Sequence, residues 1–182
     1  MTHLIVGLGN PGDKYKENRH NAGFILLEYL ISELTGSRVN ELKFDSKLDA
    51  NTLQITVKGL KYIFAEPQTY MNASGTAVQK ILNYYKIPVE NLTVIHDDLD
   101  IKLGEYKIQR GSGPKQHNGI SSIEDSLGTR DYNRVRVGIE NRPEDLKISG
   151  EDYVLSNFRP DEKEVFSKEV FPEIAKDLDF LS

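Results

Sequence analysis

Residues 4–12, Leu4-Ile5-Val6-Gly7-Leu8-Gly9-Asn10-Pro11-Gly12, read as a short apolar strand that leads straight into a glycine-rich loop. Glycine lets a backbone approach a ligand closely, and loops held by a rigid scaffold often carry function. The glycine spacing also fits the dinucleotide fingerprint, which requires a helix that opens inside the glycine run. Here Pro11 and the polar residues 13–18 postpone the apolar helical pattern until Phe24. The segment therefore predicts a strand with a functional loop rather than a dinucleotide site.

Helix and strand patterns alternate along the rest of the chain. Apolar residues recur at helical spacing from Phe24 to Leu34, before Gly36. Two apolar runs that flank Lys58-Gly59 predict a hairpin. Further strands are expected at 92–95, 106–109 and 134–139, and further helices at 77–85, before Gly128, and from Pro160 to Pro172, with Ile174, Leu178 and Leu181 on a short last helix.

This alternation predicts an α/β fold, a three-layer sandwich with a mixed, largely parallel central β-sheet flanked by helices. A length of 182 residues suits a single domain, 1–182. In such sheets, ligands collect outside the carboxyl ends of the strands. Polar loops that carry Asn10, Asn72, Asp97 and Asn118 are expected to converge there.

Composition restricts the possible locations and chemistries. The sequence has no apolar run of membrane-spanning length and no signal-peptide pattern, so we expect a soluble, cytoplasmic protein without a membrane partner. The absence of cysteine excludes disulfides, thiolate nucleophiles and cysteine-based zinc sites. No apolar surface stripe is evident, which favours a monomer.

Charge is distributed unevenly along the chain. A net charge of −5 and a pI near 5.4 argue against a surface that binds nucleic acid throughout. The acid-rich part begins at Glu140, whereas basic residues gather in the preceding segment, as Lys107, Arg110, Lys115, Arg130, Arg134 and Arg136. A local basic patch therefore stays possible.

His20 has two interpretations. It is either a hydrogen-bonded structural histidine at the start of a helix or a general base, since imidazole has the side-chain pKa nearest to neutral pH. A base needs an orienting partner, and Asp97, expected just after the strand 92–95, is the best candidate. The alternative for Asp97 is a solvated carboxylate in a turn.

Other chemistries have weaker support. Asp97, Asp98 and Asp100 could hold magnesium, but they lack the rest of any calcium loop, and the four histidines are too scattered to indicate zinc. No Gly-x-Ser-x-Gly elbow is present for a serine nucleophile. We therefore expect no metal and no cofactor. The remaining scheme has a base that activates water, with asparagine amides holding the substrate and its oxyanion.

A series of motifs, in order, resembles the bacterial-type peptidyl-tRNA hydrolase family over most of the chain. After residues 4–12 and Tyr15 come Arg19-His20-Asn21-Ala22-Gly23, Pro67-x-Thr69-Tyr70-Met71-Asn72-x-Ser74-Gly75, His96-Asp97-Asp98-Leu99-Asp100, His117-Asn118-Gly119 and Arg134-Val135-Arg136-Val137-Gly138-Ile139.

The resemblance implies hydrolysis of the ester that joins a peptide to tRNA, with peptidyl-tRNA as the partner. His20 would be the base that activates water, Asp97 its partner, and Asn10 a third catalytic residue close to the ester. The substrate-binding residues would be Tyr15, Tyr70, Met71, Asn72 and Asn118. Contacts to the peptide backbone would explain tolerance of any peptide sequence.

The family also holds the tRNA 5′-phosphate with two basic residues. Arg136 matches one, the other falls at Gln109, and Lys107 and Arg110 lie close enough to substitute. The alternative for Arg134 and Arg136 is an edge strand protected by charge. Where the family usually has Gly-Gly-x-x-Gly-Gly, this chain has Gly111-Ser112-Gly113-Pro114-Lys115-Gln116. The family's last helix usually extends beyond the position of Ser182.

Two other functions stay open. The chain could be a non-catalytic tRNA-binding protein of the same fold, or a hydrolase of another acyl ester. Salt separates these functions, because binding of tRNA falls with added salt and binding of a small neutral ester does not.

Overall fold

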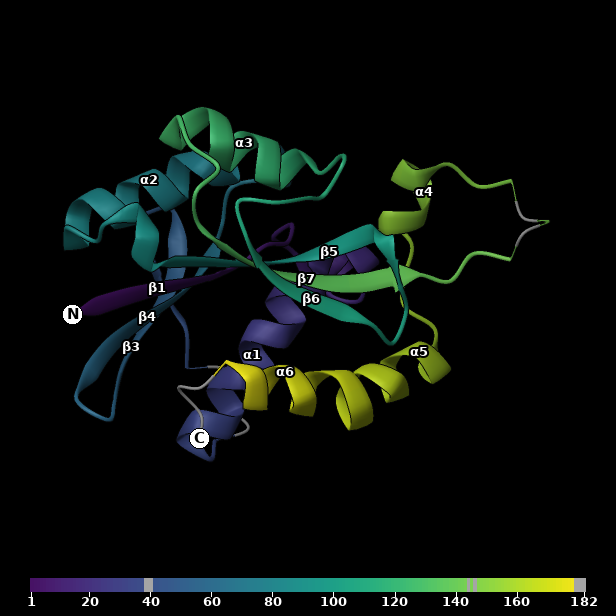
Figure 1. Ribbon diagram of the computed structural model, residues 1–182, viewed down its shortest axis with the longest axis horizontal. Coiled ribbons are helices and arrows are strands. Elements are labelled where there is room, and N and C mark those ends of the chain that lie inside the picture. Colours follow the sequence, from purple (N-terminus) through teal and green to yellow (C-terminus); the bar gives the residue numbers. More distant parts are fainter. Residues whose placement is uncertain (38–40, 144, 146, 179–182) are drawn as a thin grey trace.

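A seven-stranded sheet forms the centre of the molecule (Figure 1). The computed structural model describes residues 1–37, 41–143, 145 and 147–178. In spatial order the strands are β2 (Lys43–Asp45), β3 (Ala50–Val57), β4 (Leu60–Pro67), β1 (Thr2–Gly7), β5 (Leu92–Lys102), β7 (Asn133–Glu140) and β6 (Tyr106–Arg110). The four inner strands from β4 to β7 are parallel, whereas β2, β3 and β6 pair antiparallel. The expectation of a mixed, largely parallel sheet is confirmed.

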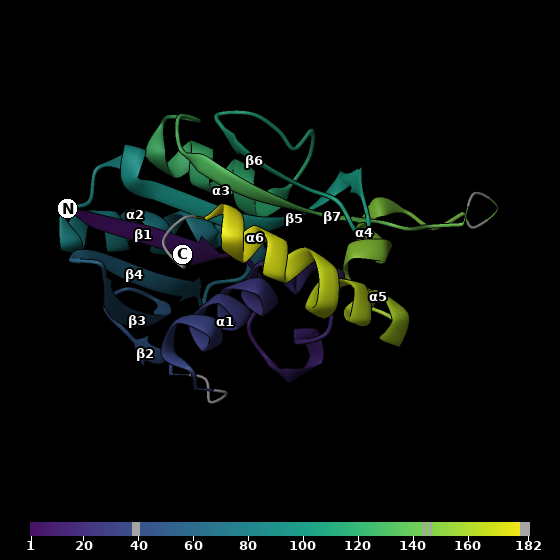
Figure 2. The ribbon, with the colours of Figure 1, turned by 60° about the horizontal axis from the view of Figure 1, so that its bottom comes forward.

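Helices cover both faces of this sheet, as predicted (Figures 1 and 2). The helices are α1 (Ala22–Thr35), α2 (Ser74–Tyr85), α3 (Asn118–Leu127), α4 (Gly150–Val154), α5 (Pro160–Val165) and α6 (Phe171–Asp177). Side chains alternate across each strand. Ile5 therefore joins the core under α1, α5 and α6, and Leu4 and Val6 join the core under α2 and α3. No helix within the described residues is both long and apolar enough to cross a bilayer.

The predicted hairpin is β3–β4, with Val57 paired to Leu60. Its two turn residues, Lys58 and Gly59, have φ angles of 50° and 80°. Two positive φ angles give a turn whose twist matches the twist of the strands.

The last helical segment differs from the prediction. Helix α5 begins at Pro160 as expected, but Pro172 does not end the segment, which continues through a π-helical turn, Phe166–Val170, into α6. In that turn the N–H of Phe171 donates to the carbonyl of Phe166, which widens the backbone just before the proline. Leu178 follows the end of α6. Leu181 lies outside the described residues.

One expectation about strands was wrong, and one open alternative is excluded. Strand β5 does not end at Ile95, because His96, Asp97 and Asp98 continue to pair with β7. Strand β7 is not an edge strand, because it lies between β5 and β6. The sequence also gave no indication of the short edge strand β2. The buried polar residues of β5 and β7 each have a partner, and the strand pattern alone does not reveal those partners. They are His96, Asp97, Asp98, Arg134 and Arg136.

Candidate active site

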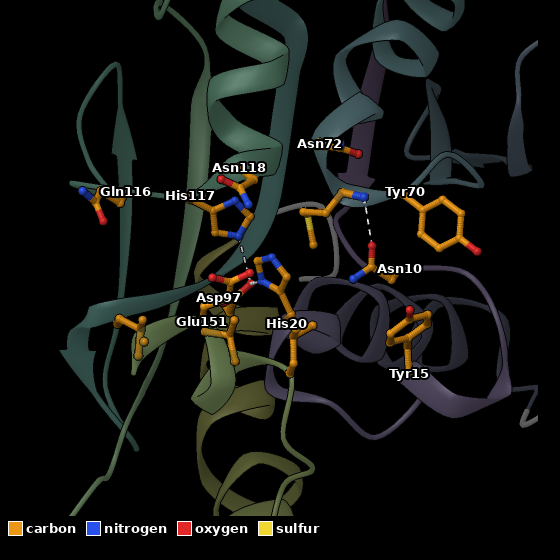
Figure 3. A pocket seen from close by; sticks show the side chains of 15 residues that line it. Asn10, Tyr15, His20, Tyr70, Asn72, Asp97, Gln116, His117, Asn118 and Glu151 are labelled. Carbon is orange, nitrogen blue, oxygen red and sulfur yellow. Dashed lines mark hydrogen bonds and ion pairs between the residues drawn. The ribbon is translucent and has the colours of Figure 1, made fainter. Parts of the chain in front are cut away.

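A pocket of about 550 Å³ opens where β1, β4 and β5 deliver their polar residues (Figure 3). It brings together eight of the predicted site residues, Asn10, Tyr15, His20, Tyr70, Met71, Asn72, Asp97 and Asn118. The three predicted phosphate ligands, Arg136, Lys107 and Arg110, do not line it. The pocket also has a wall that sequence reasoning missed, with Leu99, Gln116, His117, Gly150, Glu151, Val154 and Leu155.

His20 and His117 share one carboxylate oxygen. The Nδ1 of His20 and the Nε2 of His117 each lie 2.9 Å from Oδ1 of Asp97, and all three side chains are buried. The Nδ1 of His117 accepts hydrogen bonds from the backbone of Gly119 and Ile120, so the ring proton is on Nε2 and is donated to Asp97. His117 is thus the N-cap of α3. With His20 Nδ1–H donated to Asp97, the Nε2 of His20 is left as a proton acceptor.

The charge of Asp97 decides the proton affinity of this group. Burial alone would raise the pKa of Asp97, but attraction to His20 and the hydrogen bonds from His20 and His117 outweigh burial and hold that pKa well below its usual range. Burial alone would lower the pKa of His20, but the charge of Asp97 and the hydrogen bond to it raise that pKa above 6.5. Asp97 is therefore ionised and orients His20 as a base. It is not the solvated turn carboxylate that the sequence left possible.

His96 supports the backbone behind this group. Its ring is fully buried, and its Nδ1 lies 2.7 Å from the carbonyl oxygen of Asp97. Burial lowers the pKa of His96 to about 3. The ring is therefore neutral at neutral pH and donates to that carbonyl.

Close backbone contact positions the first loop. A side chain on Gly7 would place a Cβ 2.5 Å from the carbonyl oxygen of Gly23, so β1 and the start of α1 meet only because neither residue has a side chain. Asn21 then closes the loop, since its side chain accepts from the N–H of Asn10 and donates to its carbonyl. The glycines serve this packing of strand against helix and leave His20 facing the pocket.

The amide of Asn10 connects two loops. Its Oδ1 accepts from the backbone N–H of Met71 at 2.9 Å (Figure 3). Its Nδ2 donates to no other described residue and can donate to a ligand in the pocket. In the turn that contains Met71, Asn72 and Tyr70 are exposed. The ring of Tyr70 meets the ring of Tyr15 edge-on, with centroids 6.4 Å apart. Asn118 is also exposed at the first position of α3. The pocket therefore has amide donors on two sides of His20 and an aromatic end.

A buried ion pair ties the loop of His20 to the wall of the pocket. The two terminal nitrogens of Arg19 reach Oε2 of Glu162 at 2.5 Å and the carbonyl of Asn157 at 2.7 Å, and the guanidinium lies 4.2 Å from the ring of Tyr153. The backbone N–H of Arg19 donates to Ser156. Arg19 directly precedes His20, so these contacts hold the segment after α4 against the loop that carries His20.

The predicted phosphate ligands lie on β6 and β7. Arg136 is mostly buried, with its Nε 2.7 Å from Oδ2 of Asp98 and its Nη1 2.7 Å from Oε1 of Gln109. Lys107 is exposed directly opposite Arg136 in the strand register. Arg110 has the other parity on β6, so it points to the opposite face, where it pairs with Asp131.

Arg134 holds the loop of residues 111–116, which departs from the usual pattern of the family. Arg134 is buried rather than free for a ligand. Arg134 donates to the carbonyl of Gly113, lies over the ring of Tyr132 and is 2.9 Å from Glu124. Gly113 has a φ of 60°, and a Cβ there would collide with the guanidinium of Arg136. The loop therefore packs directly on both arginines.

The three acidic residues suggested for magnesium do not converge. Asp97 serves the two histidines, Asp98 pairs with Arg136, and Asp100 accepts from the backbone of Lys115. Among the described residues, His20, Asp97 and His117 form a group of metal-ligand type. Because both ring nitrogens that face Asp97 donate protons to it, this group fits a hydrogen-bonded triad better than a metal site.

Glu66, in the strand that leads into the loop of Met71, is an unusual buried acid. It is 3% exposed, its Oε2 accepts from Asn51 at 3.3 Å, and its Oε1 has no partner among the described residues. Burial, with a contribution from the charge of Glu28, raises its pKa from 4.5 to about 7. Stability from its protonated form is complete below pH 4.5 and is lost as pH rises through 7.

We therefore expect Glu66→Gln to raise the unfolding free energy at pH 8 by roughly 1–3 kcal/mol and to change it little at pH 4.5. Urea denaturation at both pH values measures this difference. Glu41→Gln, a change of the same type at a partly exposed residue, is the control. Equal effects of Glu66→Gln at the two pH values would contradict a raised pKa.

Comparison with known proteins agrees with the motifs. Residues 4–182 match the model of a protein family that is described as "Peptidyl-tRNA hydrolase". The peptidyl-tRNA hydrolase of Geotalea uraniireducens is 47% identical over 159 residues, which cover 87% of this chain and 79% of that protein. The peptidyl-tRNA hydrolase of Bdellovibrio bacteriovorus is 43% identical over an alignment that covers 87% of this chain and 82% of that protein. The crystal structure of peptidyl-tRNA hydrolase from Acinetobacter baumannii has a TM-score of 0.85 at 31% identity and covers 99% of this chain and 88% of its own. The predicted resemblance is thus confirmed, and the chain belongs to the peptidyl-tRNA hydrolase family.

Proposed function

We propose that this chain hydrolyses the ester between peptide and tRNA in peptidyl-tRNA, with His20 as the general base that activates water. Membership of the family makes the chain a hydrolase of this ester. One observation supports the mechanism above all. Asp97 holds Nδ1 of His20 at 2.9 Å, which leaves Nε2 as the proton acceptor in a pocket that also offers amide donors.

The reaction can be written with its protons balanced. His20 Nε2 takes a proton from water as the water oxygen bonds to the ester carbonyl carbon, and Asp97 stabilises the imidazolium that forms. The free Nδ2 of Asn10 stabilises the oxyanion. As the intermediate collapses, the bond to the ribose oxygen breaks and His20 returns its proton to that oxygen. The products are free tRNA and the peptide carboxylic acid, which loses its proton to solvent and becomes the carboxylate.

The other predicted residues bind substrate in this proposal. Asn72 and Asn118 hold the peptide main chain by hydrogen bonds that do not depend on its sequence, and Tyr15, Tyr70 and Met71 form an apolar path for it. The protein thereby recycles peptidyl-tRNA that has dropped off or stalled in translation. Residues 1–182 act as one domain, since both core clusters pack on one sheet. We propose a cytoplasmic monomer, because translation supplies the substrate there and the sequence shows no apolar surface stripe.

The tRNA phosphate is proposed to meet Arg136 and Lys107, which share one face of the sheet. Arg136 would offer a nitrogen that Asp98 and Gln109 do not occupy. Arg110 faces the opposite side and is paired with Asp131, so it would assist only after leaving that pair.

The function is tested by release of peptide from an N-blocked aminoacyl-tRNA in the presence of EDTA, with free aminoacyl-tRNA as a second substrate. We expect metal-independent hydrolysis of the blocked substrate, with affinity that falls as salt is added. Binding of tRNA without hydrolysis would favour the non-catalytic alternative. Neither binding nor hydrolysis would favour an enzyme for another acyl ester.

The pH dependence of kcat/KM is expected to follow the free base. Because the pKa of His20 is raised, the fraction of neutral imidazole, and with it the rate, falls as pH drops through an apparent pKa above 6.5. Initial rates between pH 5.5 and 9 measure this limb. A profile that is flat across this range would contradict a base with the raised pKa.

Asp97→Asn is expected to lower kcat by roughly 10–100-fold, less than the loss of His20 itself, because an amide cannot stabilise the imidazolium by charge. The acid limb of the pH profile should also move to lower pH. Asp125→Asn, an exposed residue on α3, is the matched control. An effect confined to KM would instead place Asp97 in substrate binding.

A further inference from the structure

The short helix α4 places a carboxylate in the pocket for which the proposed mechanism has no use. Glu151 is exposed and lines the pocket, and Figure 3 shows it on the side where Asp97 lies, across from Tyr15 and Tyr70. No hydrogen bond or ion pair joins this carboxylate to another described residue. The next residue, Asp152, differs, because its carboxylate accepts from Ser149 at 2.7 Å.

The charge of Glu151 is not balanced within the pocket. None of the fifteen lining residues is lysine or arginine. The other lining carboxylate, Asp97, is 2% exposed and faces two histidine rings. Arg142, which donates to the carbonyl of Ile148 just before α4, pairs with Glu140, and Lys115 lies 3.8 Å from Asp100. Low-dielectric walls around a cleft strengthen the field of such a charge.

We propose that Glu151 determines specificity, making the pocket favour peptidyl groups whose esterified amino acid has a positively charged side chain over those with a negatively charged one. This inference rests on the proposed function, because the ester must lie beside His20 for water to attack it. The side chain of the esterified residue then lies in the same pocket as Glu151. RNA phosphates would be repelled by a carboxylate, which assigns Glu151 to the peptidyl part of the substrate rather than to the tRNA backbone.

The test uses one tRNA body that carries Nα-acetyl-lysine, Nα-acetyl-alanine or Nα-acetyl-glutamate as its esterified residue. The charge of the lysine and glutamate side chains is thereby retained. The measurement is kcat/KM for each, with the alanine substrate as the reference. We expect the wild type to prefer the lysine substrate over the glutamate substrate by roughly tenfold, and added salt to narrow this ratio. Glu151→Gln should bring the ratio close to one, and Glu151→Lys should invert it. Glu169→Gln, the same change at an exposed residue outside the pocket, should keep the wild-type ratio.

The outcomes are distinct. The same lysine-to-glutamate ratio in the wild type and in folded Glu151→Gln would overturn the role of Glu151. An equal loss on all three substrates would also overturn it and would indicate a contact with the terminal nucleoside. A wild type that hydrolyses none of the three substrates would overturn the proposed function itself. Thermal unfolding of each variant confirms that it is folded before rates are compared.

Discussion

His20→Ala is expected to lower kcat for peptidyl-tRNA by about 10²–10⁴-fold, the range that a general base contributes. The reason is the geometry of one ring. Its Nδ1 is committed to Asp97 at 2.9 Å, so no other atom of the described triad can take the proton of water as Nε2 does. His117 cannot replace it, because the Nε2 of His117 donates its proton to the same carboxylate. Single-turnover release of peptide measures the loss.

Two further variants separate chemistry from folding. His20→Asn keeps an N–H donor at the position of Nδ1 but supplies no base, so it should lose as much activity as His20→Ala while retaining the contact to Asp97. His3→Ala removes a histidine at the far end of β1, where the ring stacks on Tyr62, and should leave turnover unchanged. Turnover near the wild-type level in folded His20→Ala would defeat the assignment of His20 as the base.

Most of the fold could be predicted because its patterns are local. The alternation of apolar runs, the positive-φ turn at Lys58-Gly59 and the proline at the start of α5 each depend on neighbours in sequence. The remaining features depend on partners outside the local pattern or on an irregular backbone. Arg134 looked like an exposed edge residue, yet Glu124 and the loop at Gly113 bury it. Pro172 looked like a helix end, yet a π turn accommodates it.

The same difference applies to the pocket. His20, Asp97 and the asparagines stand in motifs that could be recognised, and the structure brings them to one pocket. His117 was the neighbour of a predicted residue, and only the hydrogen bonds to Gly119 and Ile120 show that it caps α3 while it holds Asp97. The wall with Glu151 and Val154 comes from a five-residue helix with no pattern of its own. The position of this helix depends on the contacts that Arg19 makes with Ser156 and Asn157, which follow the helix in sequence.

That contact gives the second large effect. Arg19→Ala leaves Glu162, which is 0% exposed, as a buried carboxylate without its cation. We therefore expect the unfolding free energy to fall by about 3–5 kcal/mol, as for other broken buried pairs. Urea denaturation measures it. Lys163→Ala breaks the exposed pair with Glu17 and should cost less than about 1 kcal/mol. A loss as small in Arg19→Ala would contradict a buried, structurally required pair.

The double variant Arg19→Met with Glu162→Gln distinguishes stability from positioning. It removes both charges, so no unpaired ion is left in the core, and most of the lost stability should return. The arginine contacts to Ser156 and Asn157 are still missing, so the wall of the pocket is no longer fixed to the residue before His20. We expect kcat to stay roughly tenfold low even though the protein is stable, because small displacements of a positioned base are costly. Full recovery of kcat together with stability would show that the pair acts on folding alone.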